Sequence, residues 1–238
     1  MALAPVTEEP VPIVWENTVV DIEPTSQLGA EASPDTASIN TTLLLDVPKP
    51  GPVSFIAPGH WEDEVMARPF GRSPGMKPAE VVQRGEATFA ELVERFSAMR
   101  RRRDADDARV ERMLRKVRRF HRFSLELDAG RRLVRFFTRL PIIQEDDESY
   151  KFSGIYPVEF TELAKDGDFS VVVLLPRNAT GYTGTPNYLV RLVDATPDPE
   201  PTILDGKRHP APGERIAVSW YWRVDPILDV RYVYDRVI

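Results

Sequence analysis

The feature that most constrains the fold is a change to two-residue periodicity after residue 120. In residues 123–127 apolar Phe and Leu side chains alternate with Ser and Glu, as expected of a strand that buries one face. An Asp-Ala-Gly turn at 128–130 leads into a second apolar run at 133–140, so the sequence predicts a β-hairpin. Further strand candidates follow at 151–160, 169–175, 187–193, 215–224 and 228–234.

Loops rich in proline and glycine separate these strand candidates, and almost no helical periodicity remains after residue 120. Several short strands with connections of this kind are typical of a sandwich of two packed sheets. The sequence therefore predicts a mostly-β fold, an antiparallel β-sandwich.

The first 60 residues hold nine of the 22 prolines in the chain. Short β-like pieces occur at 11–15, 18–22 and 41–47, but the segment alone should bury too little apolar surface to offset its ordering entropy. We therefore predict an extended Pro-rich N-terminal arm and connector over residues 1–77, which is ordered by lying on neighbouring subunits or by folding back on its own domain.

One or two short helices are predicted between this arm and the later strands, the second being either a full helix or a helix that passes into a strand near Phe120. Gly85 can redirect the chain before the first helix, at 88–96, and Glu86 suits the positive end of its dipole. A second helical pattern follows at 110–120, with basic side chains on its polar face. The apolar residues of the first helix share one face by their spacing: Phe89, Leu92, Val93 and Phe96.

An Arg-Pro turn, a Gly-Glu step and the first helix follow one another between residues 66 and 97. The residues of this motif are Arg68, Pro69, Gly85, Glu86, Leu92, Arg95 and Phe96. The motif resembles the capsid proteins of picorna-like RNA viruses, such as dicistroviruses, iflaviruses and marnaviruses. In that family the helix opens a jelly roll.

The resemblance implies a jelly-roll β-sandwich domain over residues 78–238, behind the arm, in a structural subunit of a non-enveloped icosahedral virus. It implies assembly with other capsid subunits, contact with genomic RNA, no enzymatic activity and no cofactor. The location would be the virion, and the host cytoplasm during assembly. Three other classes stay open: a bacterial or phage shell, tail or decoration protein, a β-sandwich binding module, and a hydrolase or sugar-active enzyme on a β-sandwich.

Positive charge is concentrated in residues 95–139, which hold 16 of the 31 Lys and Arg residues. Arginine clusters neutralise phosphates without reading bases, so nucleic acid is one candidate partner. The acidic arm of a neighbouring subunit is the other, because residues 1–94 hold 15 Asp and Glu against 5 Lys and Arg. The candidate contact residues of this basic block are Arg100, Arg101, Arg102, Arg103, Arg109, Arg112, Arg115, Lys116 and Arg119.

The sequence contains no readable catalytic or metal-binding motif. There is no cysteine, and His60, His121 and His209 lack the spacing of metal ligands, so we predict no catalytic, cofactor or metal residues. The acidic run at 145–148 is interpreted as a solvated loop tip rather than a cation site. In the aromatic run at 220–222, alternation places the two Trp side chains on one face and Tyr on the other, which favours a core or a subunit contact over a stacking platform.

Residues 1–10 lack the basic and apolar regions of a signal peptide, and no apolar run is long enough to span a bilayer. We therefore expect neither a signal peptide nor a membrane partner.

Overall fold

A computed structural model shows an all-strand fold in which no helix occurs among the residues that the structure describes. These residues are 4–5, 11–24, 34–58, 60–61, 66–69, 77–78, 81–87, 120–142, 144–154, 163–178, 188–196, 215–222 and 228–236. The predicted mostly-β sandwich is confirmed. The predicted helices at 88–96 and 110–120 lie outside the described residues, except for Phe120, which begins the strand Phe120–Leu127. None of the described residues forms a membrane-spanning helix.

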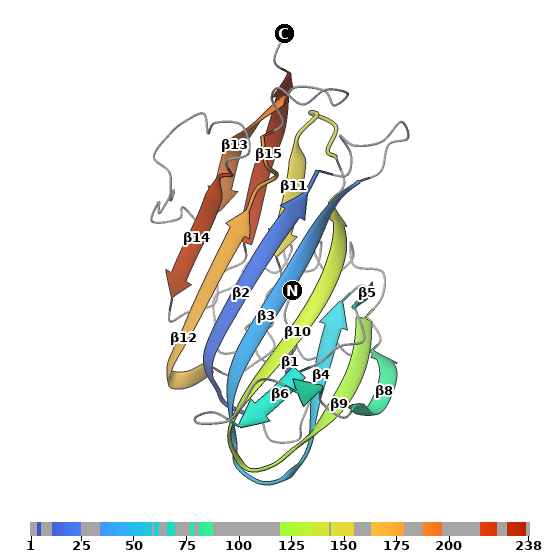
Figure 1. Cartoon of the computed structure of the whole chain (residues 1–238), viewed down its shortest axis with the longest axis vertical. Coiled ribbons are helices and arrows are strands. Elements are labelled where there is room, and N and C mark those ends of the chain that lie inside the picture. Colours follow the sequence, from blue (N-terminus) through green and yellow to red (C-terminus); the bar gives the residue numbers. More distant parts are fainter. Residues whose placement is uncertain are drawn as a thin grey trace, which may run out of the picture.

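A long eight-stranded sheet runs the length of the molecule (Figure 1) in the order β14-β12-β2-β3-β10-β6-β7, with β5 also paired to β10. The β12–β2 pair is parallel and the other pairs are antiparallel, so this sheet is mixed. Its strands are β2 (Ile13–Glu23), β3 (Asp35–Val47), β5 (His60–Trp61), β6 (Met66–Pro69), β7 (Lys77–Pro78), β10 (Gly130–Ile142), β12 (Leu163–Leu174) and β14 (Ala217–Trp222).

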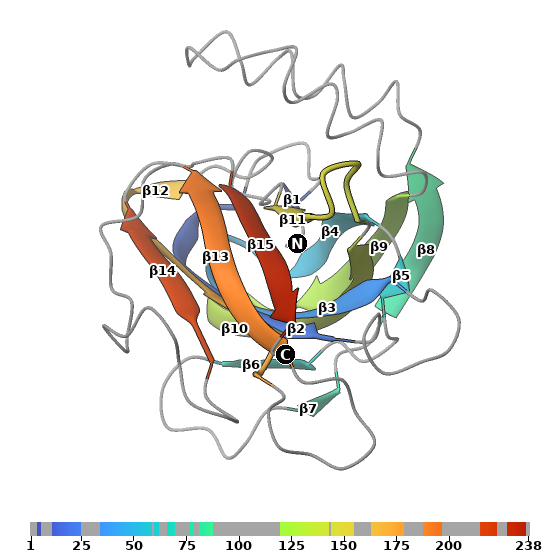
Figure 2. The same ribbon diagram turned by 90° about the horizontal axis from the view of Figure 1, so that it is seen from above.

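Two smaller sheets cover one face of the long sheet, side by side along its length (Figures 1 and 2). The four-stranded sheet contains β1 (Ala4–Pro5), β4 (Gly51–Pro58), β9 (Phe120–Leu127) and β8 (Val81–Ala87), in that order. The three-stranded sheet contains β11 (Tyr150–Gly154), β15 (Leu228–Arg236) and β13 (Tyr188–Thr196), in that order. The sandwich is therefore one long layer against two short layers.

A bent two-stranded ribbon joins the long sheet to the four-stranded sheet. β3 pairs with β10 up to the Val47–Gly130 pair, and β4 pairs with β9 from the Gly51–Leu127 pair onward. Both strands of the ribbon fold over between these pairs, where Gly51 has φ 148° and Gly130 has φ 93°. Glycine suits both positions because side chains disfavour positive φ.

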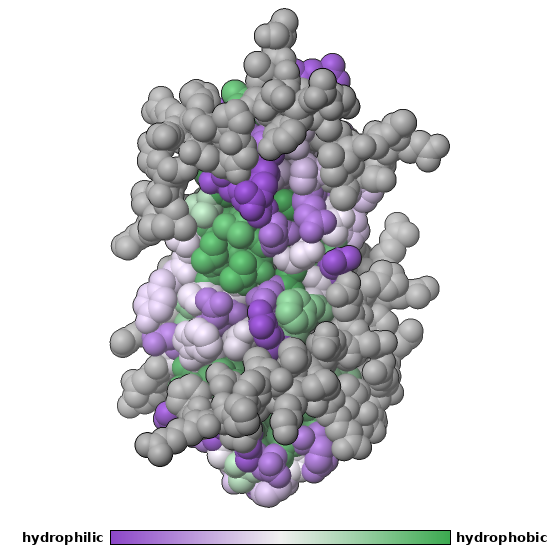
Figure 3. Space-filling view, viewed as in Figure 1, coloured by the Kyte–Doolittle hydropathy of each residue, from purple (hydrophilic) through white to green (hydrophobic). Residues whose placement is uncertain are grey.

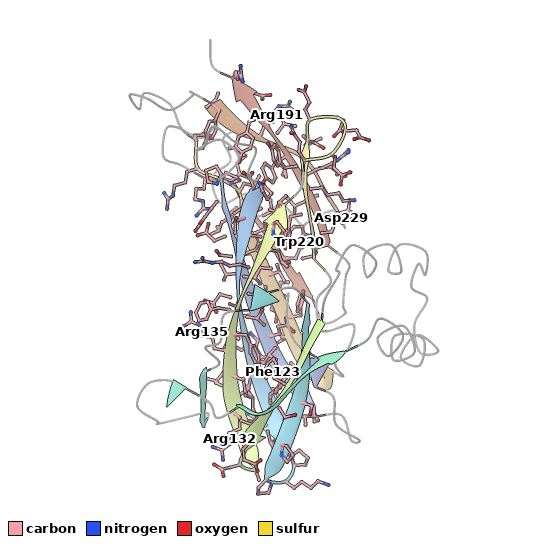
Figure 4. All side chains as sticks on the ribbon, turned by 90° about the vertical axis from the view of Figure 1, so that its right-hand side faces the viewer. Phe123, Arg132, Arg135, Arg191, Trp220 and Asp229 are labelled. Carbon is pink, nitrogen blue, oxygen red and sulfur yellow. The ribbon has the colours of Figure 1, made fainter. Side chains whose placement is uncertain are left out.

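Arg132 holds the turn of this ribbon. Its Nε donates to the carbonyl of Asp128 at 2.9 Å, and its Nη2 donates to the carbonyl of Ala129 at 2.8 Å (Figure 4). The predicted hairpin is wrong, because β9 and β10 are consecutive but lie in different sheets. Each strand finds its partner far away in the chain, in β4 and β3 respectively.

The two short layers give the molecule two apolar clusters. Beneath the four-stranded sheet, the rings of Phe55, Phe123 and Phe136 pack with centroids 5.4–5.8 Å apart. Beneath the three-stranded sheet, Phe169 and Trp220 are among the buried residues. Each short layer is thus held to the long sheet by its own apolar contacts, the main favourable term in packing two sheets.

A buried carboxylate adds a polar tie between the long and three-stranded sheets. Tyr232 and Tyr234 of β15 each donate a hydrogen bond of 2.6 Å to Oδ2 of Asp35, at the start of β3. The ring of Tyr150 stacks on that of Tyr232, with centroids 5.4 Å apart. Burial raises the pKa of both phenols and the Asp35 carboxylate adds to the shift, so both hydroxyls remain donors.

The structure corrects the predicted arm over residues 1–77. Strands β2 and β3 lie inside this segment, yet they occupy the centre of the long sheet, and Ile22 and Leu43 are fully buried. The prolines that suggested an arm stand at strand ends: Pro12 and Pro24 flank β2, and Pro34 and Pro48 flank β3. Proline lacks an N–H donor and so delimits a central strand without interrupting it. A boundary between residues 77 and 78 therefore does not separate an arm from the sandwich.

Deleting residues 1–60 should abolish cooperative folding, because the deletion removes two central strands and the partner of β9. Circular dichroism and urea unfolding of the truncated chain measure this. A truncated chain that still unfolds in one sharp transition would contradict the central placement of β2 and β3.

Replacing Gly130 by Ala should destabilise the protein by about 1 kcal/mol through backbone strain. No heavy atom lies within 4 Å of the position that the new Cβ would take, so a clash contributes nothing. Gly130→Asn is the matched control and should cost less, because Asn tolerates positive φ better than Ala. Urea denaturation compares the three chains, and an Ala variant as stable as the parent would exclude the strain.

Candidate functional site

A charged groove lies on the outer face of the three-stranded sheet, with a volume of about 270 Å³. All three strands of that sheet contribute to it: β11 provides one residue, and β15 and β13 provide two each. Figure 4 shows Asp229 on this side of the sandwich, Arg135 on the opposite side, and Trp220 and Phe123 between the layers. The lining residues are Lys151, Asp194, Thr196, Asp229 and Arg231.

Strand register arranges the lining residues in two rows. Arg231 in the middle strand stands opposite Lys151 on one side and opposite Asp194 on the other. Asp229, two residues away, stands opposite Thr196. Their chain neighbours on β15, such as Val230, point inward and are buried, so alternation brings the polar residues together on one face.

A β-bulge in β13 completes the groove. The register shifts between Leu192, opposite Tyr232, and Asp194, opposite Arg231, and the extra residue Val193 is 44% exposed. Regular pairing would place Val193 opposite Arg231 and Ala195 opposite Asp229. The bulge instead turns Asp194 and Thr196 toward the groove, a common use of bulges beside binding sites.

The groove combines positive and negative groups. Lys151 Nζ lies 3.4 Å from Asp229 Oδ2, and Thr196 Oγ1 donates to Asp194 Oδ2 at 3.4 Å. Arg231 Nη2 also donates at 2.9 Å to Oδ2 of Asp147, a residue that lies outside the groove. Two cations, two carboxylates and a hydroxyl can hold a polar ligand by hydrogen bonds and charge.

The acidic run at 145–148 forms the turn between β10 and β11, as the sequence predicts for a loop tip. Hydrogen bonds from Ser149 lower the pKa of Asp147, and Arg231 adds to this. Glu148 adopts φ 62°, and its N–H donates to the Glu145 carbonyl at 3.1 Å. Among the described residues no three His, Asp or Glu side chains gather as metal ligands would.

A second polar feature lies inside the sandwich, between the two apolar clusters. Glu16 on β2 is fully buried, and Thr18 donates to its Oε1 at 3.1 Å. The hydroxyls of Thr18 and Thr41 lie 3.0 Å apart. No described residue provides a hydrogen-bond partner for Glu16 Oε2.

Glu16 points inward because of another bulge. The register of β2 against β3 shifts between Ile13 and Trp15, which puts Glu16 on the same buried face as Ile13. Burial raises the pKa of Glu16 to about 8, and the hydrogen bond from Thr18 offsets part of the rise. The side chain is therefore mostly protonated at neutral pH, which limits the cost of burying it.

The outer face of the long sheet carries a small hydrophobic patch over β2 and β12 (Figure 3). Val19 and Val172 are paired there on neighbouring strands, and both are half-buried. Arg135 lies over the ring of Phe137, 5.1 Å from its centre. Neighbouring side chains thus already cover part of this face.

The four motif residues that the structure describes lie in two different sheets. Arg68 and Pro69 are the last two residues of β6 in the long sheet rather than a turn. Gly85 and Glu86 lie within β8 of the four-stranded sheet instead of opening a helix. Leu92, Arg95 and Phe96 lie outside the described residues, as does the whole basic block at 100–119.

The aromatic run at 220–222 follows the predicted alternation where its side chains are described. Trp220 is buried in the core, and Tyr221 is 63% exposed on the other face. The core interpretation is confirmed for Trp220.

Sequence reasoning missed the groove and Glu16. The alternating Asp229 and Arg231 were readable as one polar strand face, and Glu16 stands out in the strand-like run from Val11 to Ile22. No local sequence pattern indicates the two bulges that turn Glu16 toward the core and Asp194 and Thr196 toward the groove.

Comparisons with known proteins identify a similar fold among solved structures. No family model matches the chain, and no curated protein matches it. Among solved structures, a Legionella pneumophila protein described as a "putative nutrient binding protein" aligns with a TM-score of 0.50 and 10% sequence identity. The alignment covers 98% of this chain and 70% of that one.

The expected role as a viral capsid subunit is wrong. The Legionella structure that shares the fold bears the name of a nutrient binding protein, not a capsid protein. Within the described residues, the supposed assembly arm is part of the sandwich itself. The seven motif residues resembled a capsid motif by spacing alone, and short motifs often match by chance.

Stability should fall as the pH rises from about 4.5 to about 8, because Glu16 has its ordinary pKa of 4.5 when unfolded and a pKa of about 8 when folded. The folded state binds more protons in this window, and the loss over the full window amounts to several kcal/mol. Urea unfolding at a series of pH values measures it. Glu16→Gln should flatten this part of the profile, whereas Glu23→Gln, at the exposed end of β2, is the matched control and should not. An unchanged profile in Glu16→Gln would contradict the assignment.

Proposed function

We propose that the protein is a β-sandwich binding module that holds a small polar ligand in the groove of the three-stranded sheet. The observation that carries the proposal is the gathering of Lys151, Arg231, Asp194, Asp229 and Thr196 from three strands around one cavity. Concave sites with a few convergent polar groups are the usual place for small ligands. The name of the structure with the same fold is compatible with a binding role.

The groove rests on a rigid support. Beneath it, Val230 and Phe152 are buried, and the Asp35–tyrosine contacts fix β15 to the long sheet. Side chains on strands keep their spacing better than side chains on loops, so little ordering is needed when a ligand binds. This favours binding of a small ligand.

The ion pair between Arg231 and Asp147 fixes one edge of the groove. Asp147 is held by the backbone N–H of Ser149 at 3.2 Å, and it orients the Arg231 guanidinium. A guanidinium fixed in this way presents its remaining N–H groups in a defined direction, which suits a planar anionic or hydroxyl group on a ligand.

Small polar probes should shift the backbone amide signals of β11, β13 and β15. Glucose, L-glutamine, citrate and putrescine represent four ligand classes for an NMR titration. Arg231→Gln should weaken binding of the responding class by about tenfold or more, because a hydrogen bond to a charged group is lost. Arg191→Gln is the matched control: Arg191 pairs with Asp235 on the same sheet at 2.8 Å, outside the groove.

The proposal fails if none of the four probe classes shifts the signals of these strands. It also fails if the responding strands lie elsewhere, or if Arg191→Gln weakens binding as much as Arg231→Gln.

A further inference from the structure

The groove holds two cations next to two carboxylates, and their positions bear on the class of ligand that the proposed binding function would serve. In the row of Lys151, Arg231 and Asp194, the two cations are neighbours and the carboxylate stands at the far end. Asp229 stands beside Arg231 along β15 and opposite Thr196. The two cations therefore stand on β11 and β15 and the two carboxylates on β15 and β13, and the Lys151–Asp229 contact of 3.4 Å joins the two sets.

Neighbouring strands are about 4.8 Å apart, and alternate residues along a strand are about 6.7 Å apart. The backbone positions of the cations and the carboxylates are thus about one to two strand spacings apart. A single small molecule can reach both sets.

We infer that the ligand is a small zwitterion, with its carboxylate between Lys151 and Arg231 and its ammonium group between Asp194 and Asp229. A free α-amino acid has both groups on one carbon and fits this description. The inference rests on the proposed binding function and names the ligand class of the same groove.

Ligands with one sign of charge fit this arrangement less well. An anion meets the two aspartates, and a cation meets Lys151 and Arg231, so each is repelled by half of the groove. A zwitterion meets a complementary group at both ends. The existing Lys151–Asp229 contact, at 3.4 Å, is longer than a typical charge-assisted hydrogen bond of about 2.8 Å, so a ligand can replace it at little cost.

Neutral sugars are also a poorer match. Sugar sites gain much from an aromatic ring that stacks on the sugar face, and none of the five lining residues is aromatic. The well exposed Tyr221 belongs to β14 of the long sheet, not to this one. A volume of about 270 Å³ lies just below the range of about 300–1,000 Å³ for drug-sized ligands, which suits an amino acid.

The test is a titration of the full chain with each of the twenty common L-amino acids, followed by amide signals of β11, β13 and β15. The best binder is then compared with two analogues, one lacking the ammonium group and one lacking the carboxylate. For alanine these are propionate and ethylamine. Each analogue should bind at least tenfold more weakly than the amino acid.

Two variants separate the roles of the two sets. Asp194→Asn should weaken amino-acid binding about tenfold without weakening binding of the carboxylate-only analogue, because the ammonium contact is lost while repulsion of the anion falls. Lys151→Gln should do the reverse, sparing the amine-only analogue. Asp235→Asn, on the same sheet but outside the groove, is the matched control and should change neither. Thermal melts confirm that each variant folds. If only one of the two groove variants folds, its binding of the amino acid and of the two analogues still tests the inference.

The outcomes distinguish a failure of the zwitterion inference from a failure of the proposed binding function. If an analogue binds as tightly as its amino acid, or if only glucose, citrate or putrescine shifts these strands, the zwitterion inference is overturned and the binding module stands. If no probe of any class shifts them, both are overturned.

Discussion

The antiparallel pairing of residues 35–58 with residues 120–142 is the constraint on which the rest of the structure depends. The ribbon spans the middle of the long sheet and then, at its bend, supplies two strands of the four-stranded sheet. Glycines at positive φ and the Arg132 hydrogen bonds allow both strands of the ribbon to turn at the same position along it. Because one ribbon belongs to two layers, the separation of those layers and the apolar cluster between them are set together.

The ribbon also decides where the groove stands. β2 and β12 add to one side of it, and Asp35 at the start of β3 binds the tyrosines of β15. The three-stranded sheet is therefore fixed over one half of the long sheet, with its inward face buried and its outward face free to carry charge. The polar groups around Glu16 lie between the two apolar clusters. The interior is therefore divided into two apolar parts, one beneath each of the two short sheets.

Local patterns were sufficient for strand positions. Five strand candidates after residue 150 correspond to β11, β12, β13, β14 and β15, and the turn at 145–148 lies where the acidic run predicts it. Proline density misled in the first 60 residues, because prolines at strand ends look in sequence like prolines in an arm. The turn at 128–130 was a real turn, yet its two strands separate, since a turn alone does not require that its flanking strands pair.

The sequence by itself determined that the chain is mostly β, which residues alternate in each strand, and that Trp220 faces the core. These follow from side-chain periodicity, which acts over a few residues. Only the tertiary structure decided which strands pair, that β2 and β3 are central in the long sheet, and that Lys151, Asp194, Asp229 and Arg231 share a groove. Pairing joins residues up to about 150 positions apart, and a bulge shifts a face by one residue, so both depend on contacts that no local pattern records.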